Sequence, residues 1–239
     1  MKESLENKKG SFLAVRHSYD DHKYLDGKND TDLTEEGIKI AKKAAIQIYP
    51  YIYKDVVLIR HTPKKRGYQT ADIICEYLLK KGITCTYINE PNLIELWQGD
   101  INFKTMEHVD KVNFLQSCWD VFNEHRMSGD LTYRFGQEKN GNVIENPGNC
   151  FKEWTCRIAE ALLRNIFDIE CGIQSINVTH RGVIHDMEQI IKYVNGEIAM
   201  DSIETYPGRR MQYCQEEKLE FNDIEKAKIL IKEYKQIRS

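Results

Sequence analysis

The sequence lacks any apolar run that approaches the roughly 18 residues a membrane-spanning helix needs. Residues 1–10 are polar and charged, with neither the apolar segment nor the cleavage signature of a secretory signal. The seven cysteines are scattered, without a Cys-x-x-Cys pair, and an odd count without a framework is typical of reduced thiols. These absences predict a cytoplasmic protein with no membrane partner.

The sequence also has no excess of basic residues. Lysine and arginine number 34 against 37 aspartate and glutamate, which gives a formal net charge of −3. This balance offers no broad positive field for nucleic acid, so any anion site must be local. The histidines show no tight metal-ligand spacing, and we therefore predict neither a metal nor a cofactor.

The remaining composition is that of a globular chain: 239 residues, 41% of them hydrophobic and 30% charged. Short apolar runs alternate with amphipathic helical segments, a rhythm that favours βαβ units and a parallel sheet. Strands are predicted within 11–18 and at 55–60, 84–88, 175–179 and, at the sheet edge, 210–214. Helices are predicted between Thr34 and Pro50, at 68–81, 105–124, 151–167 and 183–193, and after a cap at Asn222.

This pattern predicts an α/β fold, a three-layer α/β/α sandwich with a mostly parallel central sheet. The stretch 101–150 breaks the rhythm, because a helix is followed there by a Gly/Asn-rich loop without strand alternation. We interpret 101–150 as a helical and loop cap insertion within a single domain, 1–239. Tyr133 and Arg134 on its loop are candidates for a lid over the site.

Polar side chains of one kind follow three predicted strands. Arg16-His17 follows the first, Arg66 lies soon after the second, and His180 with Arg181 follows the fourth. Ligands of open α/β sheets bind beyond the carboxyl ends of the strands, where these groups would converge. Guanidinium groups suit phosphate oxygens and an imidazole can act as a nucleophile, so the pattern indicates phosphoryl transfer.

Five motifs occur in a fixed order along the chain: Arg16-His17, Leu33-Thr34-x-x-Gly37, Arg66-Gly-Tyr-Gln-Thr-Ala71, Leu93-x-Glu95-x-x-x-Gly99 and Thr179-His180. In order and spacing this series resembles the histidine phosphatase (phosphoglycerate mutase-like) superfamily. A weaker match is Tyr206-Pro207-Gly208.

The resemblance implies a role for each matching residue. His17 would be the phosphorylated nucleophile, and Glu95 would act as proton donor and then as base. Arg16, Arg66 and His180 would bind the phosphoryl group, with His180 also part of the catalytic set.

The chain departs from the family pattern at three positions close to the site. Ser18 stands where the family usually has glycine, Arg181 replaces a glycine after the second histidine, and Thr62 stands where a serine is common. We treat all three as candidate substrate contacts. The pair Arg60-His61, also at a strand end, is a rival nucleophile, although no Leu-Thr-x-x-Gly follows it at the expected distance.

The sequence thus predicts a metal-independent phosphatase that hydrolyses a phosphate monoester of a small metabolite through a phosphohistidine. Two alternatives stay open: a phosphotransferase of the phosphoglycerate mutase type, and a catalytically weak phosphate-ligand-binding module. The predicted partner is a small phosphorylated substrate rather than nucleic acid, and a homodimer stays open as well.

Overall fold

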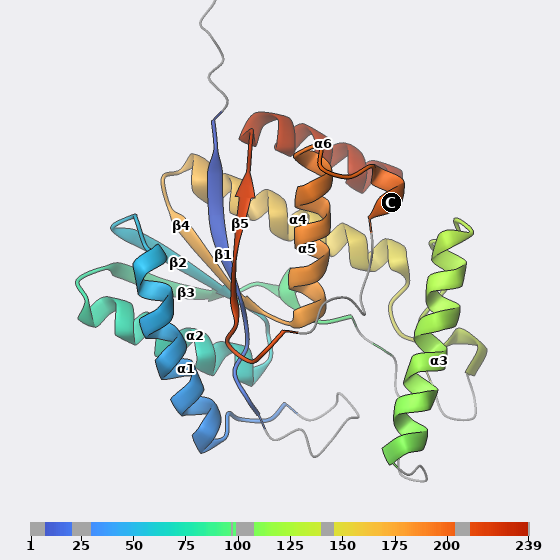
Figure 1. Ribbon diagram of the computed structural model, residues 1–239, viewed down its shortest axis with the longest axis horizontal. Helices are drawn as coiled ribbons and strands as arrows, with labels where there is room; N and C mark the ends of the chain where they lie inside the picture. Colours follow the sequence, from blue (N-terminus) through green and yellow to red (C-terminus); the bar gives the residue numbers. More distant parts are fainter. Residues whose placement is uncertain are drawn as a thin grey trace, which may run out of the picture.

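The computed structural model describes residues 8–20, 30–96, 98, 108–139, 146–203 and 211–238. At its centre is a five-stranded sheet in the order β3-β2-β4-β1-β5 (Figure 1). The strands are β1 (Gly10–Arg16), β2 (Val56–His61), β3 (Thr84–Asn89), β4 (Gln174–Thr179) and β5 (Glu216–Phe221). The first four are parallel and β5 runs antiparallel to β1. The predicted mostly parallel sheet is confirmed.

The predicted edge strand at 210–214 is wrong, because the edge strand is β5, further along the chain. Four of its six residues are charged, and this masks the alternation. Only Leu219 and Phe221 point inward and are buried, as one face of an edge strand requires.

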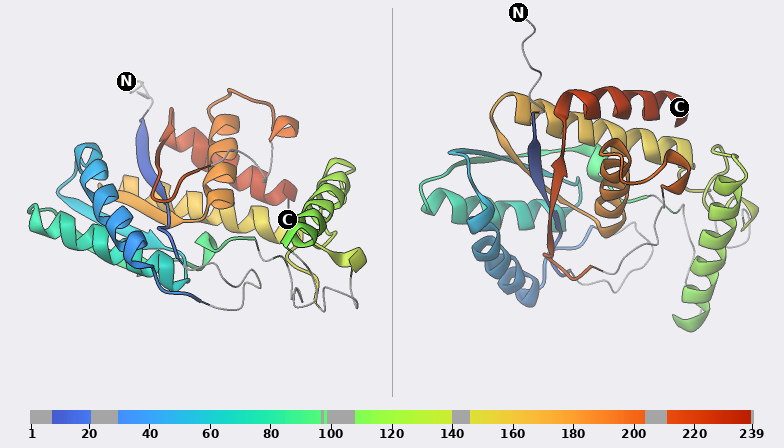
Figure 2. Two further views of the ribbon diagram at one scale, coloured as in Figure 1. Left: turned by 60° about the horizontal axis from the view of Figure 1, so that its bottom comes forward. Right: turned by 45° about the horizontal axis from the view of Figure 1, so that its top comes forward.

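Helices cover both faces of the sheet (Figures 1 and 2). They are α1 (Glu35–Ile48), α2 (Lys65–Lys80), α3 (His108–Met127), α4 (Phe151–Glu170), α5 (Arg181–Val194) and α6 (Ile224–Arg238). Thr34 caps α1 as predicted, by accepting a hydrogen bond from the amide of Gly37. The cap of α6 is Asp223 rather than Asn222, since its carboxylate accepts from the amide of Lys226.

The alternation of β1 divides the core into two parts. Phe12 and Ala14 face α4, α5 and α6, whereas Leu13 and Val15 face α1 and α2. All four side chains are at most 2% exposed, so β1 is buried on both faces. This double coverage is the predicted three-layer sandwich.

The part of the insertion that is described consists mainly of α3 and the short loop before α4. It lies beside the N-terminal end of α4, away from the sheet (Figures 1 and 2). Trp119 and Phe122 of α3 are buried there against Phe135 and Phe151. No helix within the described ranges is long and apolar enough to cross a membrane.

Candidate active site

The carboxyl ends of the three adjacent strands β2, β4 and β1 are joined by backbone hydrogen bonds. The amide of His17 donates to the carbonyl of Thr179 over 2.8 Å, and the amide of Thr62 donates to that of Val178 over 2.9 Å. The residues that follow each strand are therefore held side by side. His17, His180 and Thr62 are all at most 3% exposed.

The tautomer of His17 follows from its two neighbours. Its Nδ1 lies 2.8 Å from the carbonyl oxygen of Ser18, which can only accept, so Nδ1 carries the proton. Its Nε2 lies 3.1 Å from Nε of Arg66, which can only donate. Nε2 therefore holds the lone pair and directs it toward a guanidinium.

Arg66 is oriented by an acid that the motifs did not single out. Its Nη1 lies 3.4 Å from Oδ2 of Asp20, which is fully buried and also accepts from the hydroxyl of Thr31 over 2.7 Å. The signal available in the sequence was an acidic residue three positions after the nucleophile. Asp20 fixes the guanidinium of Arg66 against His17.

The ring of His180 lies 4.9 Å from that of His17, centroid to centroid, at an interplanar angle of 68°. Its Nε2 is 3.0 Å from the hydroxyl of Thr62, so Thr62 contacts the second histidine directly. Burial lowers the pKa of His180 well below its usual 6.5, and the nearby charges of His17 and Arg66 lower it further. His180 is neutral at pH 7.

Arg16 lies on the opposite side of His17, against an aromatic ring. Its Cζ is 3.9 Å from the ring centroid of Tyr213, and Nη1 donates to the carbonyl of Met211. Tyr213 is also within 6.0 Å of the His17 ring. No motif identified Tyr213, which comes from the segment before β5. Arg16, Met211 and Tyr213 border a cleft of about 830 Å³ that is walled on its other side by α1.

Glu95 sits at the N-terminus of α5. Its carboxylate accepts from its neighbour Leu96 and from Gly182 in the first turn of that helix. Burial raises the pKa of Glu95, although these amides and the charges of Arg181 and Arg66 oppose the rise. A carboxyl with a raised pKa near a cationic pocket is suited to proton donation. The positive charge of Arg181 lowers the pKa of Glu95, so Arg181 is a cation next to the site.

The order of the motifs along the chain has a physical counterpart, because their residues contact one another behind His17. The amide of Ser18 donates to Thr70, and the amide of Leu33 donates to Gln69. A Cβ on Gly37 would lie 2.0 Å from the carbonyl oxygen of Tyr19, so only glycine lets the loop after His17 rest on α1.

One candidate substrate contact and both candidate lid residues have partners within the protein. Ser18 is fully buried and its hydroxyl donates to the carbonyl of Gly37 over 2.6 Å, so it braces the loop instead of facing a substrate. Arg134 pairs with Glu153 on α4, and Tyr133 stacks on His125 at 3.8 Å. Both candidate lid residues thus hold the insertion together.

The rival pair, Arg60-His61, has structural partners of its own. Arg60 makes a bidentate ion pair with Asp168 at 2.7 and 2.8 Å, and His61 packs against the rings of Tyr68 and Tyr87. Gly99 and 206–208 lie outside the described residues. Among the residues that are described, no group of three or more His, Cys, Asp or Glu is arranged to hold a metal ion.

Comparisons with known proteins agree with this geometry. The family model of the histidine phosphatase superfamily (branch 1) matches residues 12–190. Among solved structures, the mycobacterial glucosyl-3-phosphoglycerate phosphatase superposes with a TM-score of 0.59 at 15% identity, covering 91% of this chain and 94% of its own. The structure titled mycobacterial hydrolase 1 gives 0.60 at 16% identity, with 89% and 91% covered.

A third neighbour is the α-ribazole phosphatase from Shigella flexneri, with a TM-score of 0.52 at 20% identity and coverage of 87% and 89%. No curated protein matches the chain by sequence. The structural neighbours share the fold, and the family model covers more than half of the sequence, including all five motifs. The chain belongs to the histidine phosphatase superfamily, branch 1.

Proposed function

We propose that the protein is a phosphatase that hydrolyses a phosphate monoester of a small metabolite through a phosphohistidine at His17, without a metal. The observation that carries the proposal is the environment of His17 Nε2. This nitrogen is unprotonated and faces Nε of Arg66 at 3.1 Å, and the centroid of the His180 ring lies 4.9 Å from that of the His17 ring. A nucleophile with its lone pair directed into a cationic pocket is suited to attack on phosphorus.

In the first step the phosphate oxygens accept hydrogen bonds from the donors of the pocket. Arg66 exchanges its bond to Nε2 for a phosphate oxygen, and Arg16 with His180 supplies further donors. His17 Nε2 then forms a bond to phosphorus as the ester oxygen leaves. Glu95, whose pKa is raised by burial, gives its proton to that oxygen.

In the second step the roles of Glu95 reverse. Its carboxylate takes a proton from water, the water oxygen bonds to phosphorus, and the bond from phosphorus to Nε2 breaks. Inorganic phosphate leaves, and Nδ1 keeps its proton on the carbonyl of Ser18 throughout. The same intermediate could return its phosphate to a hydroxyl of a second molecule, which is the phosphotransferase alternative.

The test uses His17→Gln and, as a matched control, His61→Gln. His61 is the corresponding histidine at the end of β2, and its Nδ1 has the same contact with the next carbonyl, at 2.9 Å. With p-nitrophenyl phosphate in EDTA, we expect phosphate release from the wild type and from His61→Gln, and none from His17→Gln. Acid-labile, base-stable protein label should follow the same pattern.

Label that persists in His17→Gln would place the nucleophile elsewhere. No turnover of any ester by a protein that still binds phosphate would leave the binding module as the function. Label that passes to a second hydroxyl in place of water would identify a phosphotransferase.

Glu95→Gln tests the acid. It cannot protonate the leaving oxygen, so we expect turnover to fall most for esters with poor leaving groups and least for p-nitrophenyl phosphate. The measurement is kcat across a series of phenyl phosphates of graded leaving-group pKa. An equal loss across the series would remove Glu95 from the proton transfer.

A further inference from the structure

Arg157, on the second turn of α4, has a buried donor that the site described above does not use. Its Nη2 donates to the side-chain oxygen of Asn149 over 3.1 Å. Its Nε is buried, and no acceptor within the described residues lies in hydrogen-bond reach. A buried N–H of a cation without an acceptor is costly, and native structures rarely keep one without a reason.

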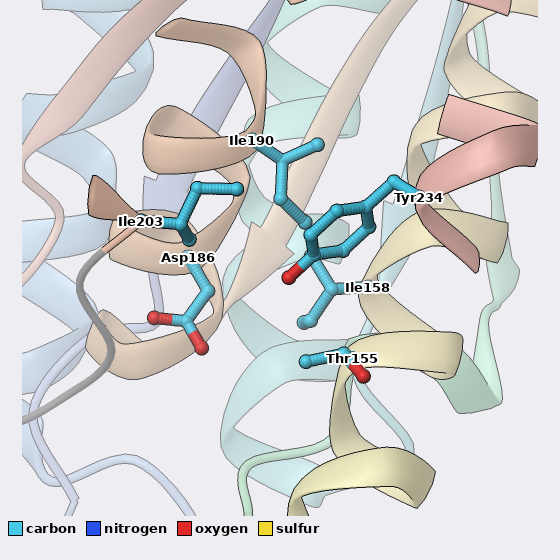
Figure 3. Close-up of a pocket in the computed structure, with 6 residues that line it drawn as sticks. All are labelled: Thr155, Ile158, Asp186, Ile190, Ile203 and Tyr234. Carbon is cyan, nitrogen blue, oxygen red and sulfur yellow. The ribbon is translucent and has the colours of Figure 1, made fainter. Parts of the chain in front are cut away.

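The guanidinium is held in place by a rigid platform. Its Cζ lies 5.2 Å from the ring of Trp154, which is 1% exposed and donates its indole N–H to the carboxyl of Asp186 on α5. Figure 3 shows Asp186 on α5 beside Thr155 and Ile158 of α4, so the platform is part of the packed contact between these two helices. The face of Arg157 on Trp154 is therefore fixed, while its buried Nε has no acceptor among the described residues.

The position of Arg157 relates it to the leaving group. Its charge interacts with that of Glu95, and Glu95 also interacts with Arg66 of the phosphate pocket. Helix α4 packs on the short turn Pro91–Leu93 that leads into Glu95. Because Glu95 serves the ester oxygen in the proposed mechanism, the group attached to that oxygen would come near Arg157.

We propose that Arg157 binds a second anionic group, a carboxylate or phosphate, on the leaving group of the substrate. This inference rests on the proposed function and narrows its substrate class to esters with two anionic groups. A guanidinium offers an anion a fixed fork of donors, and the stack on Trp154 limits the entropy lost on binding. The neutral part of the leaving group needs no contact with Arg157.

The experiment compares two phosphonates that no phosphatase can hydrolyse: 3-phosphonopropionate, which carries a carboxylate, and propylphosphonate, which does not. Binding is measured by calorimetry for the wild type, Arg157→Gln, Arg157→Lys and the control Lys152→Gln, which removes one charge from the exposed surface of the same helix. We expect the wild type and Lys152→Gln to prefer the carboxylated ligand about tenfold. Arg157→Gln should lose the preference and Arg157→Lys should keep part of it.

Turnover of phenyl phosphate, whose leaving group carries no second anionic group, checks folding. All four proteins should hydrolyse it at similar rates. An equal preference in the wild type and Arg157→Gln, with phenyl phosphate still hydrolysed, would overturn the inference and leave the proposed function standing. So would an unchanged preference with only a shifted pH profile, because Arg157 would then act on Glu95 alone. A protein that binds the phosphonates but hydrolyses no ester would refute the proposed function and not the anion site.

Discussion

Replacing Asp186 by asparagine tests the effect of a buried carboxyl whose charge interacts with that of Glu95. Asp186 is 3% exposed, and burial raises its pKa to about 8, with a further rise from Glu95 and an opposing effect from the indole N–H of Trp154. Other charged or titratable groups that act on it are Arg126 of α3 and, through the shared core, Tyr234 of α6. Asparagine keeps the size of the side chain and an oxygen that can accept from Trp154.

The raised pKa sets the sign of the pH dependence. Between about pH 5 and pH 8 the folded protein keeps a proton on Asp186 that the unfolded chain, with its usual pKa of 3.8, has released. The free energy of unfolding therefore falls as pH rises through this window, by at most about 1.4 kcal/mol per pH unit from this one group. From pH 5 to pH 7 the wild type should lose up to about 2.7 kcal/mol relative to Asp186→Asn, and the difference should level off above pH 8.

Urea unfolding at pH 5, 6, 7 and 8, followed by tryptophan fluorescence, measures this difference. Asp120→Asn, at an exposed position on α3, is the control and should run parallel to the wild type at every pH. If Asp186→Asn also runs parallel, Asp186 is ionised in the folded protein at pH 7 and the reasoning from burial is refuted. A difference of the opposite slope would mean that its ionised form is the stabilised one.

Two further substitutions test the supports of the site. Asp168→Asn removes the bidentate partner of Arg60, whose side chain is 7% exposed, so we expect a loss of about 3–5 kcal/mol in urea unfolding, and a loss below 1 kcal/mol would contradict the pairing. Gly67→Ala would put a Cβ 2.3 Å from Cγ2 of Thr62, which contacts His180. We expect kcat for p-nitrophenyl phosphate to fall at least tenfold while the fold is retained, and unchanged kinetics would show that Thr62 does not position His180.

Most of the fold could be predicted because its elements carry strong local patterns. Strands β1 and β2 are apolar runs, and α1, α2, α4 and α5 have one clear apolar face. Strand β4 is the exception in composition: Gln174, Ser175 and Asn177 are buried, yet polar. Their partners come from distant segments, such as Asp168 for Ser175 and Asn165 for Asn177, and no local pattern identifies such pairs.

Of the candidate site, only the residues that belong to a sequence motif could be predicted. His17, Arg66, His180 and Glu95 were found from short patterns with a fixed order along the chain, and the structure brings them to one edge of the sheet. Tyr213 was missed, because its contacts with Arg16 and His17 exist only in the folded protein. Tyr213 carries Arg16 on its ring, and nothing in the segment before β5 indicates that this segment crosses the end of β1.

The two Arg-His pairs show that an Arg-His pattern at a strand end cannot be interpreted from the sequence alone. The residues that face the histidine across the site must also be known. Both histidines place Nδ1 against the carbonyl of the next residue, so Nε2 points to the other side of each ring. At His17 that nitrogen meets Arg66, whereas His61 lies between tyrosine rings. The arginine beside His61 is neutralised by an aspartate of α4, since its side chain enters the buried face of the sheet. Of these two histidines, His17 is the one whose Nε2 lies beside a guanidinium, and this difference, rather than the imidazole itself, is the reason we propose His17 as the nucleophile.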